Sequence, residues 1–234
     1  SHWILAAVVG ISRFVGSPAA EAANPEVSVT PLPLRYSFVN GDVEKFRGHH
    51  LMIEGYVGGV MDAALHLVLP DGTVFSLDGH ALVDQNDLGA ELWLKKEDVG
   101  FINLDFSEFR KYYEGTGGVY HRFTTLKVNE TDKELALDIG KLELETGLTL
   151  DGLPELTFLY EREFKDGAKS RLTWTAVKEG TTTRNIGPSW QDIDEIVDTF
   201  AIKTSHEMAG FRLKGEQRWE LVRGEAFREE KSLA

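Results

Sequence analysis

Strict alternation of apolar and charged residues is the feature that most limits what this chain can fold into. In segment 211–221 the odd positions are mostly apolar, whereas the even positions are all charged. These charged residues are Arg212, Lys214, Glu216, Arg218 and Glu220. Successive side chains of a β-strand point to opposite faces, so the segment is predicted to be a strand with one apolar and one charged face. Segment 102–106 repeats this split.

Turn signals separate about a dozen such segments along the chain. Examples are Pro70-Asp71-Gly72, Asp78-Gly79, Asp151-Gly152 and Asp166-Gly167. Asp-Gly pairs supply the positive φ angles that hairpin turns need. Many segments have about nine to eleven residues, the length with which a tilted strand crosses a bilayer. The pattern therefore predicts an all-β fold, an antiparallel up-and-down β-barrel of amphipathic strands. Segment 189–196 is the exception, because Ser189 followed by Asp192 predicts a short helix or a loop.

Composition excludes several classes of function. The net charge of −13 argues against a nucleic-acid partner, because binding phosphates needs a basic face. The chain has no cysteine, so it has no disulfide, no thiol nucleophile and no covalently attached c-type haem. No nucleophile elbow, phosphate loop or dinucleotide fingerprint is present. We therefore expect a protein that is not an enzyme and that has no cofactor of its own.

The first residues predict a separate organisation. An apolar run, 3–11, precedes Ala20-Glu21-Ala22, which has small residues where a signal peptidase cleaves. Residues 1–23 are interpreted as the remnant of an export signal, the alternative being an ordinary buried strand or helix. Prolines 25, 31 and 33 predict a linker over 24–34. The β-barrel domain is then expected over 35–234.

A group of histidines is the one candidate metal site. In a strand, His50 and Glu54 would share a face, and His66 on the next strand could approach them. With His49 they would supply the nitrogen and oxygen ligands that a metal needs. The alternative is a pair of exposed histidines near a turn, without a metal.

Segment 109–120, FRKYYEGTGGVY, resembles a stretch of large bacterial outer-membrane β-barrels. These are the decahaem-cytochrome-associated proteins, the porin components of extracellular electron conduits. Segments 65–72 and 153–170, and segment 183–186 followed by 193–195, are also similar to that family. The resemblance implies a transmembrane barrel that sheathes a multihaem c-type cytochrome and carries no haem itself.

The chain departs from that family in two ways. Some members have a Cys-x-x-Cys near the mature N-terminus, which is missing here. Members also have many more strands, and a barrel of about a dozen strands is too narrow to hold such a cytochrome. The chain is therefore expected to be the N-terminal part of a larger transmembrane barrel, or a smaller relative with another role.

Three functions follow as hypotheses. The first is an outer-membrane porin, a pore or an insulating sleeve for a multihaem cytochrome in extracellular electron transfer, in contact with membrane lipid. Its expected lumen-facing residues are Arg212, Lys214, Glu216, Arg218, Glu220, Arg162 and Arg171. The second is a soluble exported lipocalin-like barrel that binds a small hydrophobic ligand, with Phe158, Trp174 and Trp219 pointing inward. The third is a β-sandwich enzyme or carbohydrate-binding module with a His/Glu metal site.

Overall fold

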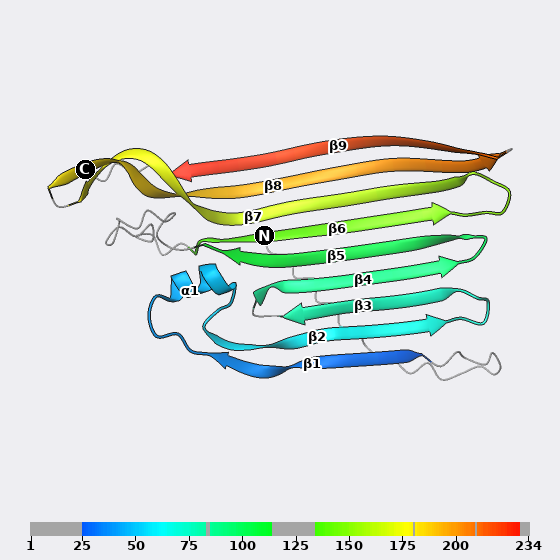
Figure 1. The fold of residues 1–234 in the computed structure, drawn as a ribbon, viewed down its shortest axis with the longest axis horizontal. Helices are drawn as coiled ribbons and strands as arrows, with labels where there is room; N and C mark the ends of the chain where they lie inside the picture. The colour runs from blue at the N-terminus through cyan, green and yellow to red at the C-terminus, as the bar shows by residue number, and fades with distance from the viewer. Residues whose placement is uncertain (1–24, 83–84, 114–133, 180, 209, 230–234) are drawn as a thin grey trace.

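The computed structural model describes residues 25–82, 85–113, 134–179, 181–208 and 210–229. They form one nine-stranded antiparallel sheet in which every strand pairs with its neighbours in sequence (Figure 1). The elements are β1 (Glu26–Ser37), α1 (Val43–His50), β2 (Gly55–Val68), β3 (Val74–Leu82), β4 (Asp87–Lys96), β5 (Gly100–Tyr112), β6 (Ala136–Leu148), β7 (Glu155–Glu179), β8 (Thr182–Met208) and β9 (Phe211–Glu229). The predicted all-β, up-and-down architecture is confirmed. The described strands are not closed into a barrel, because β1 pairs only with β2 and β9 only with β8.

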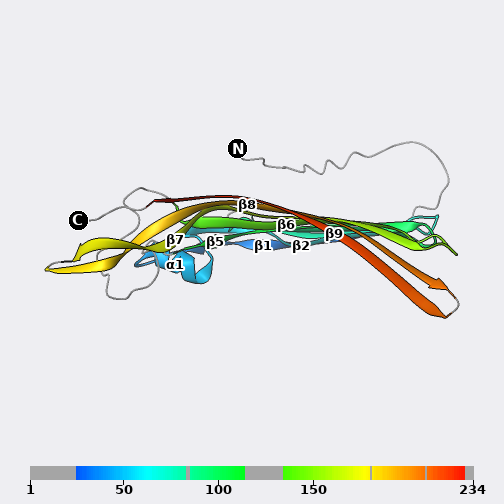
Figure 2. The same cartoon turned by 90° about the horizontal axis from the view of Figure 1, so that it is seen from above.

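The sheet is a single layer, as the view along its plane shows (Figure 2). Few apolar residues are buried in the described part of the chain. They are Val57, Tyr112, Leu135, Leu137, Ala168, Ile193 and Ala201. The helix α1 contacts β5, near one end of the strands (Figure 1). No described element covers the middle of either face, so the sheet has no central core of the kind that two packed layers make.

The connections differ between the two ends of the sheet. At one end, short segments join the strands: 69–73, 97–99, 149–154 and 209–210. At the other end lie the short connection 83–86 and the longer connections 38–54, which contains α1, and 113–135. The hairpin of β7 and β8 also extends from this end, because β6 pairs with β7 only as far as Gly167 (Figure 1).

The predicted linker over 24–34 is wrong for most of its length, because β1 begins at Glu26. Proline lacks an amide N–H and is tolerated in an edge strand, where one side of the ladder is unpaired. Pairing of β1 with β2 is irregular on either side of Pro31, between Thr30 and Pro31 and between Leu32 and Arg35. The predicted signal remnant, 1–23, lies outside the described residues.

Two local predictions of secondary structure are also wrong. His50 and Glu54, expected to share a strand, do not: His50 is the last residue of α1, and β2 begins only at Gly55. The N-cap of α1, Asp42, accepts a hydrogen bond from the Lys45 backbone N–H over 3.1 Å. Leu51, at φ 52°, ends this helix in the left-handed conformation. The expected helix at 189–196 is instead part of β8. There Ser189 pairs with Arg171 of β7, and the long ladder between the two strands overrides the local capping signal.

Gly167 lies inside β7, where the sequence predicts a turn, and its φ is 130°. A Cβ at this position would collide with the carbonyl oxygen of Ala136. We expect Gly167→Ala to lower the free energy of unfolding by about 1–3 kcal/mol, measured by urea denaturation. Gly224→Ala is the control, because its Cβ would lie 3.6 Å from the nearest atom, on Glu195. Equal midpoints for the two variants would contradict this prediction.

Candidate functional site: the two faces of the sheet

One row of apolar and aromatic side chains crosses the whole sheet. Its members are directly paired from strand to strand and therefore share a face. They are Val27, Leu65, Leu77, Leu92, Leu104, Leu144, Tyr160, Phe200 and Trp219. We call this the apolar row and its side of the sheet the apolar face. The next row toward the short connections is also mostly apolar and includes Phe75, Leu94, Ile102, Phe158 and Ile202.

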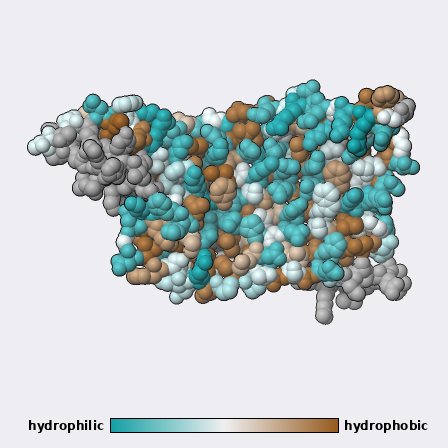
Figure 3. Space-filling model, in the orientation of Figure 1, coloured by the Kyte–Doolittle hydropathy of each residue, from teal (hydrophilic) through white to brown (hydrophobic). Residues whose placement is uncertain are grey.

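A second row, rich in carboxylates, crosses the sheet on the opposite side. Its members are Ser28, Ala64, Asp78, Glu91, Asp105, Glu143, Glu161, Thr199 and Glu220. We call it the acidic row and its side the charged face. Each member follows or precedes a member of the apolar row in the chain, as in Leu104 and Asp105. Hydrophilic side chains lie in bands across the strands on the face turned to the viewer in Figure 3.

Neighbouring carboxylates of the acidic row repel each other, and cations offset this repulsion over only part of the row. Lys141 Nζ lies 2.8 Å from Glu143 Oε2 and 2.8 Å from Glu161 Oε2. Arg218 Nη2 lies 3.7 Å from Glu220 Oε2. Within the described residues, the other three acids of the row, at 78, 91 and 105, form no ion pair. The charged face is therefore strongly acidic across its centre.

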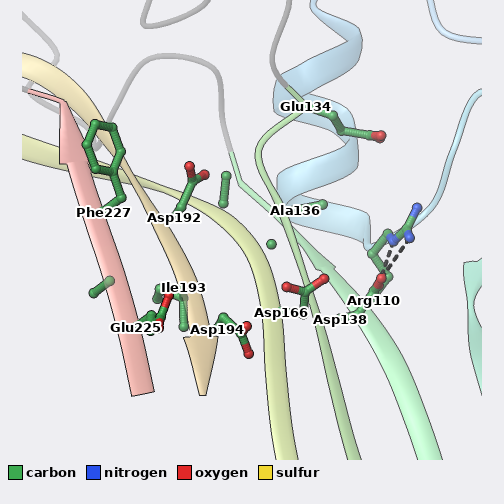
Figure 4. A pocket seen from close by; sticks show the side chains of 13 residues that line it. Arg110, Glu134, Ala136, Asp138, Asp166, Asp192, Ile193, Asp194, Glu225 and Phe227 are labelled. Atoms are coloured by element: carbon green, nitrogen blue, oxygen red, sulfur yellow. Dashed lines mark hydrogen bonds and ion pairs between the residues drawn. The ribbon is translucent and has the colours of Figure 1, made fainter. Parts of the chain in front are cut away.

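The character of the two faces reverses near the end with the longer connections. Here the apolar face carries a row of acids, Asp138, Asp166, Asp194 and Glu225. They line a groove of about 760 Å³ together with Asp192 and Arg110 (Figure 4). Arg110 is bound to Asp138 through Nε–Oδ1 at 2.7 Å and Nη2–Oδ2 at 2.8 Å. On the opposite side Leu137, the neighbour of Asp138 in the chain, is buried. The apolar surface is thus a band with a defined polar limit.

The predicted lumen-facing residues do not all share one face. Arg212, Lys214, Glu216, Arg218 and Glu220 alternate along β9 on the charged face and are exposed. Arg171 is on the same side, and its Nη1 donates to Gln191 Oε1 over 2.5 Å. Arg162 was grouped wrongly with these residues. It pairs with Leu142 and Asp198 and therefore lies on the apolar face. The alternation within one strand does not reveal how that strand is aligned with the next one. A shift of one residue in this alignment moves a side chain to the other face of the sheet.

The predicted metal site and the predicted ligand cavity do not form within the described residues. His49 and His50 end α1, whereas His66 lies on β2. Glu54 accepts a hydrogen bond from the Val39 backbone N–H over 3.3 Å. No group of three or more metal-ligating side chains occurs in the part of the chain that the structure describes. Phe158, Trp174 and Trp219 are at least 39% exposed, so they do not line an enclosed interior. No described helix is long and apolar enough to span a membrane.

The turn between β2 and β3 holds one perturbed carboxylate. Lys96 Nζ donates to Asp71 Oδ2 over 2.6 Å, and the Thr73 backbone N–H donates to Oδ1 over 3.1 Å. These hydrogen bonds, that of Lys96 first, favour the ionised form and lower the pKa of Asp71 to about 2.

We expect NMR titration of the Asp71 carboxyl to find this low pKa, and Lys96→Gln to raise the pKa toward about 4. Because the pKa is lower in the folded state, the stabilisation is complete above about pH 4 and disappears as the pH falls through about 2. Lys95→Gln, one position away on the same strand, is the control. An unchanged pKa of Asp71 in the Lys96 variant would contradict the assignment.

Comparison with known protein families, with curated proteins and with solved structures finds no match.

Proposed function

We propose that this sheet is part of the wall of a transmembrane β-barrel in a bacterial outer membrane. The supporting observation is that the apolar row and the acidic row lie back to back across all nine strands. Several side chains of the apolar face are large and exposed, such as Ile202 at 43% and Trp219 at 49%. A cation on the lipid side costs about 2–4 kcal/mol at the bilayer midplane, so the apolar face meets acyl chains and the charged face lines the lumen.

The connections agree with this orientation. Outer-membrane barrels have short turns on the periplasmic side and longer loops outside the cell. In the proposal the short connections, such as 69–73 and 97–99, are periplasmic. The helix α1 and the projecting β7–β8 hairpin are then outside the cell. The acidic groove lies at this outer end, beyond the apolar band.

A spanning sheet needs its edges paired, because lipid cannot bond an exposed N–H or C=O group. In the proposal, further strands pair with the open edges of β1 and β9 and complete the barrel. The lumen widens with the number of strands.

The role proposed for the barrel is passive, as a pore or as an insulating sleeve around a multihaem c-type cytochrome. Apolar side chains hold the wall in lipid, and the lumenal charges position whatever passes or docks. The carboxylates of the acidic row would attract a cationic surface on that partner. The proposal includes no catalytic residue and no cofactor bound by this chain.

Membrane fractionation tests the proposal directly. The full chain should be recovered with outer membranes after expression in a bacterial host, should resist carbonate extraction, and should need detergent to dissolve. Haem staining of proteins that co-purify with it tests the sleeve role. Recovery in the soluble periplasmic fraction would contradict the membrane barrel.

A further inference from the structure

A charged cluster interrupts the apolar face on β7, β8 and β9. Arg162 binds Asp198 through Nε–Oδ1 at 2.7 Å and Nη2–Oδ2 at 3.2 Å. Arg223 Nη2 donates to Asp198 Oδ2 over 2.9 Å, and the Tyr160 hydroxyl donates to Oδ1 over 2.9 Å. One carboxylate is therefore shared by two guanidinium groups, which leaves an excess of one positive charge in the cluster.

The hydrogen-bonding capacity of the two arginines is only partly used. The Asp198 side chain is 8% exposed, but those of Arg162 and Arg223 are 41% and 64% exposed. A guanidinium has five N–H donors, and no described residue accepts from Nη1 of Arg162 or from Nε and Nη1 of Arg223. The exposed donors therefore remain open to an anion.

The cluster lies near the end of the apolar band, close to the row of acids that limits it. Leu142, Phe164, Ile196 and Leu221 surround it on the same face. Toward the outer end, Glu225 follows Arg223 by two residues along β9, or about 7 Å, and its partner Asp194 is four residues from Asp198 along β8. A ligand that comes from the apolar side therefore meets the arginines before the acids.

We propose that Arg162 and Arg223 bind the phosphate group of an anionic lipid at the headgroup level of the bilayer. This inference rests on the proposed function, because it takes the apolar face to be the one in lipid. Guanidinium groups bind phosphate oxygens through charge-assisted hydrogen bonds. The negative charge of one phosphodiester would balance the excess positive charge of the cluster. Asp198 holds both guanidinium groups in place.

The test is a binding titration of the intact protein, folded in a zwitterionic detergent. The probes are short-chain phosphatidylglycerol, short-chain phosphatidylcholine and inorganic phosphate, measured by isothermal titration calorimetry. We expect phosphatidylglycerol to bind in preference to phosphatidylcholine and Arg223→Gln to weaken it about tenfold. Arg223→Lys keeps the charge and should weaken it less. Arg212→Gln, on the charged face of the same strand, should bind as the unchanged protein does.

The outcomes separate this inference from the proposed function. Equal binding of phosphatidylglycerol by the unchanged protein and the Arg223→Gln variant would overturn the lipid site. Binding of inorganic phosphate but not of phosphatidylglycerol would also overturn it, in favour of a free anion. Flotation with vesicles of phosphatidylcholine alone tests membrane insertion independently, because those vesicles lack the anionic headgroup. Insertion without a preference for phosphatidylglycerol leaves the proposed function standing and removes the inference.

Discussion

A cysteine at position 202 should resist a water-soluble maleimide in membranes, whereas a cysteine at position 203 should react at least about tenfold faster. Ile202 and Lys203 are consecutive in β8 and point to opposite faces. Both positions are accessible in the isolated sheet: residue Ile202 is 43% exposed, and the side chain of Lys203 is 40% exposed. The sheet alone therefore predicts similar reactivity, and only lipid on the apolar face makes the two positions differ.

The chain is suited to this measurement because it has no cysteine that would react in the background. Ile202→Cys and Lys203→Cys are labelled in isolated membranes, and the mass increase is followed with time. Both should react at the same rate after unfolding in urea, which controls for the chemistry of the reagent. Equal rates in membranes would contradict the assignment of the apolar face to lipid.

Asp198→Ala is expected to lower the free energy of unfolding by about 2–4 kcal/mol. Asp198 is the shared acceptor of Arg162 and Arg223, and its loss leaves two like charges side by side on an apolar face. Removing one partner of a buried pair costs about 3–5 kcal/mol, and the partial exposure of the arginines reduces that figure. Urea denaturation of the folded protein measures the change.

Two further variants make that result interpretable. Glu195→Ala removes an acid from the same strand on the opposite face, where Lys165 Nζ lies 3.3 Å from Glu195 Oε2. That pair is exposed, so the expected cost is below about 1 kcal/mol. The double variant Asp198→Ala with Arg162→Leu should recover part of the stability, because an apolar residue replaces an unpaired charge. A loss for Asp198→Ala no larger than that for Glu195→Ala would contradict a stabilising role for the cluster.

Much of the fold is predictable from the sequence because strand alternation is a local signal. The split between Leu104 and Asp105 is visible in the sequence and is preserved in the sheet. Turn signals are less reliable: Asp151-Gly152 lies in the connection between β6 and β7, but Asp78-Gly79 lies inside β3 and Asp166-Gly167 inside β7. A glycine at φ 130° fits an extended strand as well as a turn, so only its partners across the sheet decide.

The candidate site is less predictable, because it depends on register. Nothing local indicates that Asp78, Glu91 and Asp105 come to lie side by side, since they belong to three strands. A usable signal is that each acid is adjacent in the chain to a leucine, at 77, 92 and 104, because neighbouring side chains of a strand point to opposite faces. Arg162 illustrates the reverse case. The residue beside it, Glu161, is in the acidic row, and that neighbour assigns Arg162 to the other face.

The open edges of the sheet are not equivalent. β9 is 19 residues long and contains no proline, so its outer side offers a long ladder of unsatisfied amide and carbonyl groups. β1 is 12 residues long and lacks an N–H at Pro31 and Pro33. An incoming strand therefore gains more hydrogen bonds at β9 than at β1. Another strand is therefore expected to pair with the exposed edge of β9 in preference to that of β1.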